Sequence, residues 1–319
     1  MRTRGLHPSE GSAPSRGIET YNTGYYCLIR FLQRRWRWLC VTAIAAMLLL
    51  PCAGAWIFGT LYCAAYNRPV PPPQNLLVEP VAFPSASGAT LRGWLVATNA
   101  TRGVVILQHG VHSTKSSLVE RAQFLSEAGY AVLLYDFQAE GESTGERITF
   151  GFLESRDAQA AVAFVKNRFP GKPVGVIGIS LGAAAAALAK PPLDVQALVF
   201  ESMFPTIEDA TRDRMEIWLG PLSRWLAPLL TAQLPLRAGC AVEDLRPASC
   251  VEKITVPKLF LAGTRDRGTR IAEAEAMFQR AAEPKEFVPI AGARHEDLLS
   301  FAPGQYKKLI LNFLEAHLK

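Results

Sequence analysis

Ser180 is the strongest candidate nucleophile in the chain. It lies in GISLG, residues 178–182, after an apolar β-branched run and before a run of alanines. A G-x-S-x-G pattern between a strand and a helix is typical of a serine on a sharp turn, where its hydroxyl is exposed at the top of a sheet. Because glycine and serine are common, the alternative is a small residue at an ordinary strand-to-helix connection.

Two later residues, Asp266 and His295, supply the partners that such a serine requires. A base must remove the hydroxyl proton, and an acid must fix the tautomer of the base. Each follows an apolar, strand-like run, and both come after Ser180 in the expected order. Because loops after parallel strands meet at one edge of a sheet, we expect the three side chains to converge. Glu201 is the rival acid, and a loop histidine without a catalytic task is the alternative for His295.

Acyl transfer also requires N–H donors for the negative charge that develops on the substrate carbonyl oxygen. The turn LQHGVHS, residues 107–113, follows a buried strand-like run, and Gly110 lets its backbone approach a substrate. We expect the N–H groups of Val111 and Leu181 to form this oxyanion hole and His109 to hold the turn. The alternative is an ordinary turn at the end of a strand.

Alternating strand-like and helix-like segments must position these residues. The expected strands are 78–83, 91–97, 104–108, 131–135, 174–177, 195–200, 256–262 and 286–290. The expected helices are 116–128, 154–168, 181–190, 270–282 and 304–318. Several strands are continuous apolar runs, which is typical of strands buried on both faces. The sequence therefore predicts an α/β fold with a mainly parallel eight-stranded sheet and helices on both faces.

Residues 202–254 interrupt this alternation, because they form a far longer connection than is usual between two strands. Prolines divide the segment into short helical stretches, so we expect a helical cap insertion. Its apolar residues include Trp218, Leu219, Trp225, Leu226, Leu229 and Leu230. Three roles are open for them: lining a pocket for an apolar substrate, leaning on a membrane, or packing at the sheet edge without a substrate role.

Together these segments resemble the α/β-hydrolase family, in particular its esterases and prolyl oligopeptidase-like peptidases. HGVHSTKSS, YDFQAEGESTG, GISLG, ESMF, AGTRD and GARHED occur in the order of that family and span roughly residues 80–319. The resemblance implies hydrolysis of an ester, thioester or peptide bond without a metal or an organic cofactor. Gln138 and Ala139 depart from the family, which usually has arginine and glycine there, so the conformation of that loop is in question.

The basic residues are concentrated at the N-terminus. The chain has a formal net charge of +6, and residues 1–70 account for all of it. The neutral remainder has no electrostatic footprint for a phosphate backbone, so we expect no nucleic-acid partner.

A transmembrane anchor explains the basic cluster. No charged residue lies between Arg37 and Arg68, a longer stretch than the roughly 20 helical residues that cross a bilayer core. The sequence predicts a disordered basic cytoplasmic tail (1–37), a transmembrane anchor (38–67), a proline-rich linker (68–75) and a hydrolase domain (76–319). Arginines before the span place the N-terminus in the cytoplasm and the catalytic domain outside the cell membrane. The alternative is a signal peptide cleaved near Ala53-Gly54-Ala55.

Two of the six cysteines, Cys240 and Cys250, lie in the predicted outer domain. In an oxidising compartment they could form a disulfide bond, and the alternative is a pair of unpaired buried thiols. No metal-ligand spacing is present.

We therefore expect a membrane-anchored serine hydrolase that cleaves small-molecule or lipid carboxylic esters through an acyl-enzyme. A serine peptidase of the same fold and a non-catalytic binding or scaffold protein are the two alternatives.

Overall fold

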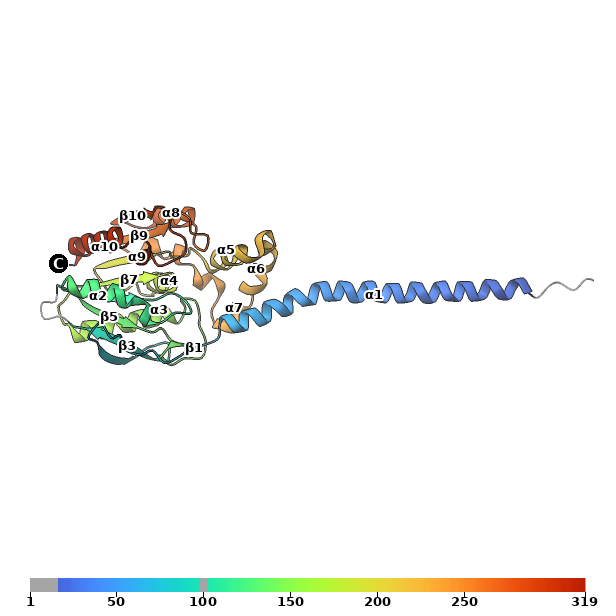
Figure 1. Ribbon diagram of the computed structural model, residues 1–319, viewed down its shortest axis with the longest axis horizontal. Helices are drawn as coiled ribbons and strands as arrows, with labels where there is room; N and C mark the ends of the chain where they lie inside the picture. Colours follow the sequence, from blue (N-terminus) through green and yellow to red (C-terminus); the bar gives the residue numbers. More distant parts are fainter. Residues whose placement is uncertain (1–16, 98–101, 319) are drawn as a thin grey trace, which may run out of the picture. The chain divides into compact units, whose positions relative to one another are not determined.

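The computed structural model describes residues 17–97 and 102–318 of the 319-residue chain. The chain divides into two compact units, Met1–Gly54 and Ala55–Lys319. Helix α1 (Gly17–Tyr62) forms the described part of the first unit, and its last turns belong to the second (Figure 1). We call Ala55–Lys319 the C-terminal unit.

Helix α1 replaces much of the disordered tail that the sequence predicts. Residues 17–37 are helical, and residues 1–16 lie outside the described part of the chain. From Tyr25 to Leu50 no glycine or proline interrupts the helix, and most residues there are good helix formers. Over Tyr25–Tyr62 the helix is long and apolar enough to cross a membrane.

The C-terminal unit is built on one eight-stranded sheet with the order β10-β9-β8-β7-β4-β5-β3-β2. The strands are β2 (Glu79–Pro84), β3 (Thr90–Val96), β4 (Val104–Gln108), β5 (Ala131–Tyr135), β7 (Val174–Ile179), β8 (Ala197–Glu201), β9 (Lys258–Gly263) and β10 (Lys285–Ile290). Only the β2–β3 and β3–β5 pairs are antiparallel. Every residue of β4, β5, β8 and β9 is buried, which explains their continuous apolar sequence. The predicted mainly parallel sheet is confirmed.

Helices cover both faces of this sheet, as the sequence predicts (Figure 1). One apolar cluster joins the sheet to α3 (Glu154–Arg168), α4 (Leu181–Leu188) and α8 (Ile271–Arg280). A second cluster joins the other face to α2 (Val119–Glu127), α9 (Leu298–Phe301) and α10 (Pro303–His317). The first turn of the helix predicted at 116–128 is a separate 3₁₀ helix, η1 (Lys115–Leu118), and α9 was not predicted.

The long insertion after β8 is a set of short helices, as predicted, and we call residues 202–254 the cap. It contains α5 (Ile207–Leu219), η2 (Gly220–Leu222), α6 (Ser223–Thr231), α7 (Leu234–Ala238), η3 (Val242–Leu245), η4 (Pro247–Ser249) and η5 (Val251–Lys253). Prolines lie at the start of η2, within α6 and at the start of α7. A proline lacks the N–H of a continuous helix, so these positions divide the segment.

The last residues of the predicted anchor (38–67) and the first residues of the predicted proline-rich linker (68–75) pack against the rest of the C-terminal unit. Tyr66–Asn67 forms β1, which pairs in parallel with β6 (Glu140–Gly141), and Val70 is buried. Strands of two residues carry no sequence pattern, so the sequence predicts neither of them. The compact unit accordingly begins at Ala55, whereas the sequence places the domain boundary at residue 76.

Cys240 and Cys250 are free thiols, so the disulfide considered from the sequence is not formed. Both pack in an apolar cluster that also contains Cys63. Burial raises the pKa of the Cys240 thiol to about 11, which keeps it protonated and unreactive at neutral pH.

Candidate active site

Ser180 occupies the sharp turn between β7 and α4. Its backbone has φ 51° and ψ −105°, a strained conformation for a residue with a side chain. The turn is held from two sides: the Ser180 N–H donates to the Glu201 carbonyl at 2.8 Å, and the Ser180 carbonyl accepts from the Ala184 N–H at 3.0 Å. The surrounding backbone therefore fixes the serine in this conformation.

The two glycines that flank Ser180 are required by close backbone packing. A Cβ on Gly182 would lie 2.4 Å from the carbonyl oxygen of Gln108, and a Cβ on Gly178 would lie 2.5 Å from the backbone nitrogen of Ala183. Neither neighbour is the end of a flexible side chain that could move away. The motif thus has a steric cause in this fold.

Asp266, just after β9, orients the imidazole of His295. Its Oδ2 lies 2.8 Å from Nδ1 of His295 and accepts a hydrogen bond from the Thr269 hydroxyl at 2.7 Å. Its Oδ1 accepts from the N–H groups of Gly268 and Thr269. Burial acts to raise the pKa of Asp266, but the hydrogen bond and charge of His295, with those from Thr269, hold it below its usual value. An ionised carboxylate therefore faces Nδ1 and leaves Nε2 available as a base.

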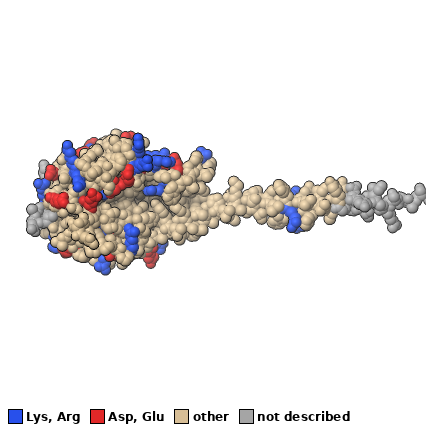
Figure 2. All heavy atoms as spheres, in the orientation of Figure 1, with Lys and Arg blue, Asp and Glu red and all other residues tan. Residues whose placement is uncertain are grey.

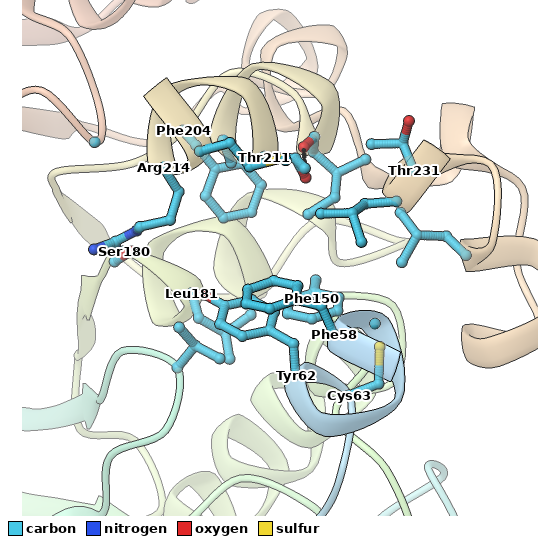
Figure 3. Close-up of a pocket in the computed structure, with 18 of the residues that line it drawn as sticks. Phe58, Tyr62, Cys63, Phe150, Ser180, Leu181, Phe204, Thr211, Arg214 and Thr231 are labelled. Atoms are coloured by element: carbon cyan, nitrogen blue, oxygen red, sulfur yellow. Dashed lines mark hydrogen bonds between the residues drawn. The ribbon is translucent and has the colours of Figure 1, made fainter. Parts of the chain in front are cut away.

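The structure brings the sequence-predicted residues to one pocket. Ser180, His295, Val111 and Leu181 all line it, and Asp266 contacts His295. Figure 3 shows Ser180 and Leu181 beside this pocket. Ser180 and His295 are not hydrogen-bonded to each other here; such bonds often tighten only when substrate is bound.

The residues that carry the two predicted oxyanion donors both line the pocket with Ser180. Leu181 is the first residue of α4, so its N–H has no partner within the helix. The turn that carries Val111 is held by buried His109, whose Nε2 accepts from the Phe137 N–H at 3.2 Å and whose Nδ1 lies 2.8 Å from the Gly110 carbonyl. Burial lowers the pKa of His109, so the ring is neutral and donates from Nδ1 to that carbonyl.

Glu201, the rival acid, is engaged elsewhere. Its Oε2 pairs with Arg121 at 2.9 Å, and its Oε1 accepts from the hydroxyl of Tyr306. Arg121 also pairs with Asp297, in the loop that carries His295. These four buried or half-buried side chains form what we call the Arg121 network, which joins α2, β8, α10 and the His295 loop. Asp266 is therefore the carboxylate that contacts the histidine.

Gln138 replaces the arginine that the family usually has, and it orders its loop in another way. Its Nε2 donates to the Arg147 carbonyl at 2.7 Å and to the Glu154 carboxylate at 2.8 Å. Ala139 adopts φ 60°, the conformation that a glycine would take without strain. The hydrogen bonds of Gln138 and the left-handed backbone of Ala139 thus give this loop a defined conformation.

The pocket beside Ser180 is largely apolar, and the cap supplies much of it. Its apolar lining includes Phe58, Tyr62, Val111, Phe150, Leu181, Phe204, Ile207, Met215, Trp218, Leu230 and Leu234. Of the six apolar cap residues singled out from the sequence, Trp218 and Leu230 line the pocket and the other four do not. Of the three roles that the sequence leaves open for these residues, lining a pocket therefore applies to Trp218 and Leu230.

The end of α1 also lines the pocket, which no signal in the sequence predicts. Phe58, Gly59, Tyr62 and Cys63 all contribute to the lining. His112, next to Val111, places Nε2 3.1 Å from the Tyr62 carbonyl and packs edge-on against its ring at 4.8 Å. A residue in a transmembrane anchor and a residue in a pocket wall are both apolar, so composition cannot separate them.

Comparisons with known proteins agree with this fold. A family model described as serine aminopeptidase, S33, matches residues 99–244. The uncharacterized protein YqkD of Bacillus subtilis is 25% identical over 244 residues, which is 75% of this chain and 80% of that protein. A monoglyceride lipase homolog of monkeypox virus is 24% identical over 250 residues, 67% of this chain and 88% of that protein. The structure of the Pyrococcus furiosus esterase Pf2001 is similar with a TM-score of 0.67 and 24% identity, over 81% of this chain and all of that one.

Proposed function

We propose, from the premise that this chain is an α/β hydrolase, that it is a serine hydrolase that cleaves carboxylic esters through an acyl-enzyme. The observation that carries the proposal is that the strained Ser180 turn and a His295 oriented by Asp266 line one pocket. That combination is the arrangement of a serine nucleophile, its base and its acid.

In the proposed mechanism the hydroxyl oxygen of Ser180 attacks the ester carbonyl while Nε2 of His295 takes the hydroxyl proton. The ionised Asp266 stabilises the imidazolium, and the N–H groups of Leu181 and Val111 stabilise the oxyanion. The tetrahedral intermediate collapses, and His295 gives its proton to the leaving alcohol. Water then attacks the acyl-Ser180 ester with His295 as base, and the carboxylic acid leaves.

An ester with an apolar acyl group suits the pocket best. Aromatic and aliphatic side chains form most of the lining, and burying a substrate chain against them is favourable at about 25 cal/mol per Å². Two of the similar proteins bear the names esterase and monoglyceride lipase homolog. Both signs of charge are interspersed on the visible face of the C-terminal unit (Figure 2), which supports a small-molecule or lipid ester as partner in place of a nucleic acid.

A serine aminopeptidase is the second candidate, because the matching family model carries that description. An aminopeptidase must bind the positively charged amino group of its substrate. The charged side chains in the described pocket lining, apart from His295, are Arg214 and Arg237, and no aspartate or glutamate is among them. Two cations would repel an amino group, so the ester is the better proposal.

Covalent labelling of the purified full chain tests the proposal. A fluorophosphonate probe should label the wild type, and Ser180→Ala should abolish both labelling and hydrolysis of p-nitrophenyl esters. Ser202→Ala is the matched control, because Ser202 is a buried serine with φ 47° outside the pocket lining. Absence of labelling in the folded wild type would overturn the proposal. Turnover of aminoacyl amides with negligible turnover of esters would favour the peptidase.

The second part of the proposal is the membrane. We propose that α1 is a single-pass anchor in the cell membrane, after a basic cytoplasmic tail, with the catalytic domain on the outer side. Support comes from the apolar segment within Tyr25–Tyr62 and from the arginines at 30, 34, 35 and 37. The protein should stay with membranes in alkaline carbonate, and protease added to spheroplasts should digest the C-terminal unit. Release by carbonate, or protection from the protease, would contradict this topology.

A further inference from the structure

Helix α5 presents one face to the pocket, and that face contains a single charged residue. The pocket-lining residues of α5 are Ile207, Ala210, Thr211, Arg214, Met215 and Trp218. Their spacing of three and four residues defines one face of a helix. An arginine therefore lies on a face that is otherwise apolar or neutral.

Arg214 differs from its neighbours because it makes no ion pair and no side-chain hydrogen bond with any residue that the structure describes. The four acids of α5 are already paired with other arginines. Their pairs are Glu208 with Arg246, Asp209 with Arg212, Asp213 with Arg212 and Arg270, and Glu216 with Arg270. The acidic partners that α5 could offer are thus taken by side chains outside the pocket.

The other pocket-lining arginine, Arg237, already has its own partners. Its Nη2 donates to the Trp56 carbonyl at 2.7 Å and to the Gln233 side chain at 2.9 Å, and its guanidinium stacks on the Trp56 ring. Arg237 therefore holds the end of α1 against the cap. Within the described pocket lining, Arg214 is the cation that remains without an ion pair or hydrogen bond.

The position of Arg214 relates it to the proposed chemistry. Its half-buried side chain extends from α5 toward Ser180 (Figure 3), and both line the same pocket. Its charge also acts on the phenol of Tyr62 at the opposite wall. A guanidinium carries five N–H donors in a fixed fork that matches a carboxylate or phosphate group. Placing one among apolar side chains is costly unless an anion joins it.

We propose that Arg214 binds an anionic group of the substrate, so that the enzyme acts on esters that carry a carboxylate or a phosphate near the scissile bond together with an apolar chain. The inference rests on the proposed ester hydrolysis and names its substrate class. The shared chemistry is an anionic oxygen group held by the guanidinium fork. A dicarboxylic half-ester supplies it as a carboxylate, and an acyl glycerol phosphate supplies it as a phosphate.

Two matched pairs of esters test the inference on the full chain in a neutral detergent. The carboxylate pair is mono-p-nitrophenyl glutarate and p-nitrophenyl pentanoate. The phosphate pair is 1-dodecanoyl glycerol 3-phosphate and 1-dodecanoyl glycerol. We expect kcat/KM to favour the anionic member of at least one pair by about 10-fold or more, the size expected for a charge-assisted hydrogen bond. The pair that shows the preference identifies the source of the anion.

Three variants assign the preference to the side chain. Arg214→Gln and Arg214→Met should remove it, and Arg214→Lys should restore part of it, because lysine keeps the charge without the fork. Arg224→Gln is the control, since it removes a charge from an exposed cap position outside the pocket lining. Thermal melting shows which variants are folded, and the conclusion is drawn from those.

A binding measurement separates this inference from the proposed function. Ser180→Ala cannot turn over the ester, yet by calorimetry it should bind the preferred anionic ester about 10-fold more tightly than Ser180→Ala/Arg214→Gln does. Two outcomes would overturn the role of Arg214 and leave the esterase proposal intact. One is Ser180-dependent hydrolysis without a preference for the anionic ester in either pair, and the other is a preference that persists in Arg214→Gln. Tight Arg214-dependent binding without hydrolysis of any ester would overturn the esterase and leave the anion site intact.

Discussion

The floor and the roof of the pocket are built in different ways. The floor consists of the loops at the edge of the sheet that carry Ser180, Asp266 and His295, and each is fixed by backbone contacts or hydrogen bonds. The roof consists of the cap helices and the end of α1. Here Trp218 is 64% exposed and Trp225 is 68% exposed, although large aromatic side chains are usually well buried.

This difference separates two requirements of an enzyme. Acyl transfer needs groups held to within a fraction of an ångström, which close packing and satisfied polar groups provide. Selection of a substrate needs shape and polarity, which a few side chains on short helices can set. We therefore expect floor substitutions to affect catalysis or folding strongly and roof substitutions to affect selectivity.

The largest effect should come from the two carboxylates of the floor. Asp266→Asn should lower kcat by about 10³- to 10⁴-fold with little change in Tm, because His295 loses the acceptor that fixes its tautomer.

Glu201→Gln should leave kcat within about 10-fold but cost about 3 kcal/mol of unfolding free energy, since buried Arg121 loses its charged partner. Steady-state kinetics and urea unfolding measure both. An equal loss of kcat in Glu201→Gln would indicate that Glu201 also serves as the catalytic acid.

Alanine substitutions at two glycines test how tightly the floor and the roof are packed. Gly182→Ala should cost about 3 kcal/mol of stability, because its Cβ would lie 2.4 Å from the Gln108 carbonyl oxygen. Gly220→Ala, in the cap, should cost about 1–2 kcal/mol, because its φ of 54° and ψ of −136° strain a residue with a Cβ, although that Cβ would meet open space. Urea unfolding measures the free energy of unfolding of both variants and the wild type, and the comparison holds where their m-values are equal. Equal costs would show that the floor relaxes as easily as the roof.

Two tryptophans test whether the roof sets chain-length selectivity. Trp218 lines the pocket and Trp225 does not. Trp218→Ala should lower kcat/KM for p-nitrophenyl octanoate relative to butanoate by about 10-fold, because it removes apolar surface that a long chain would cover. Trp225→Ala should leave this ratio unchanged. A shift of the same size in both variants would assign selectivity to the cap fold instead of the pocket wall.

The smallest expected effect concerns the junction of cap and core. Burial and the charge of Asp213 raise the pKa of Glu273 to about 7. Because this folded pKa exceeds the unfolded value of about 4.3, the carboxyl stabilises the fold fully below that value, and the contribution is lost as pH rises through about 7. Between pH 5 and pH 8 the Tm of Glu273→Gln should therefore fall about 3 °C less than that of the wild type. The exposed Glu275→Gln is the control, and identical slopes in all three proteins would contradict the assignment.

The sequence predicts most of the floor, because its signals are local. Continuous apolar runs mark the buried strands, and the glycines around Ser180 mark a turn whose steric reason, the approach of Gln108, is visible only in the fold. The choice of Asp266 over Glu201 depends on Arg121, which meets Glu201 across 80 residues of sequence. No local pattern signals such a long-range pairing.

The roof could be predicted only in outline. Prolines and apolar residues indicate short helices in 202–254, but which residues face Ser180 depends on how those helices dock. The sequence already shows Arg214 at helical spacing among apolar residues of α5. This spacing indicates a binding residue only once that face of the helix is known to line the pocket. Docking of a helix is a tertiary event, so helical periodicity alone cannot assign its partner.

The contribution of Phe58, Gly59 and Tyr62 to the pocket has a practical consequence for anyone who produces this enzyme. The usual way to obtain a soluble sample is to delete the hydrophobic N-terminal helix. A truncated protein that starts after Tyr62 would lack one wall of its own cavity, and its substrate profile would describe an artificial opening. Solubilising the intact polypeptide in detergent or nanodiscs keeps that wall in place, so preparation and specificity are tied together from the first expression trial.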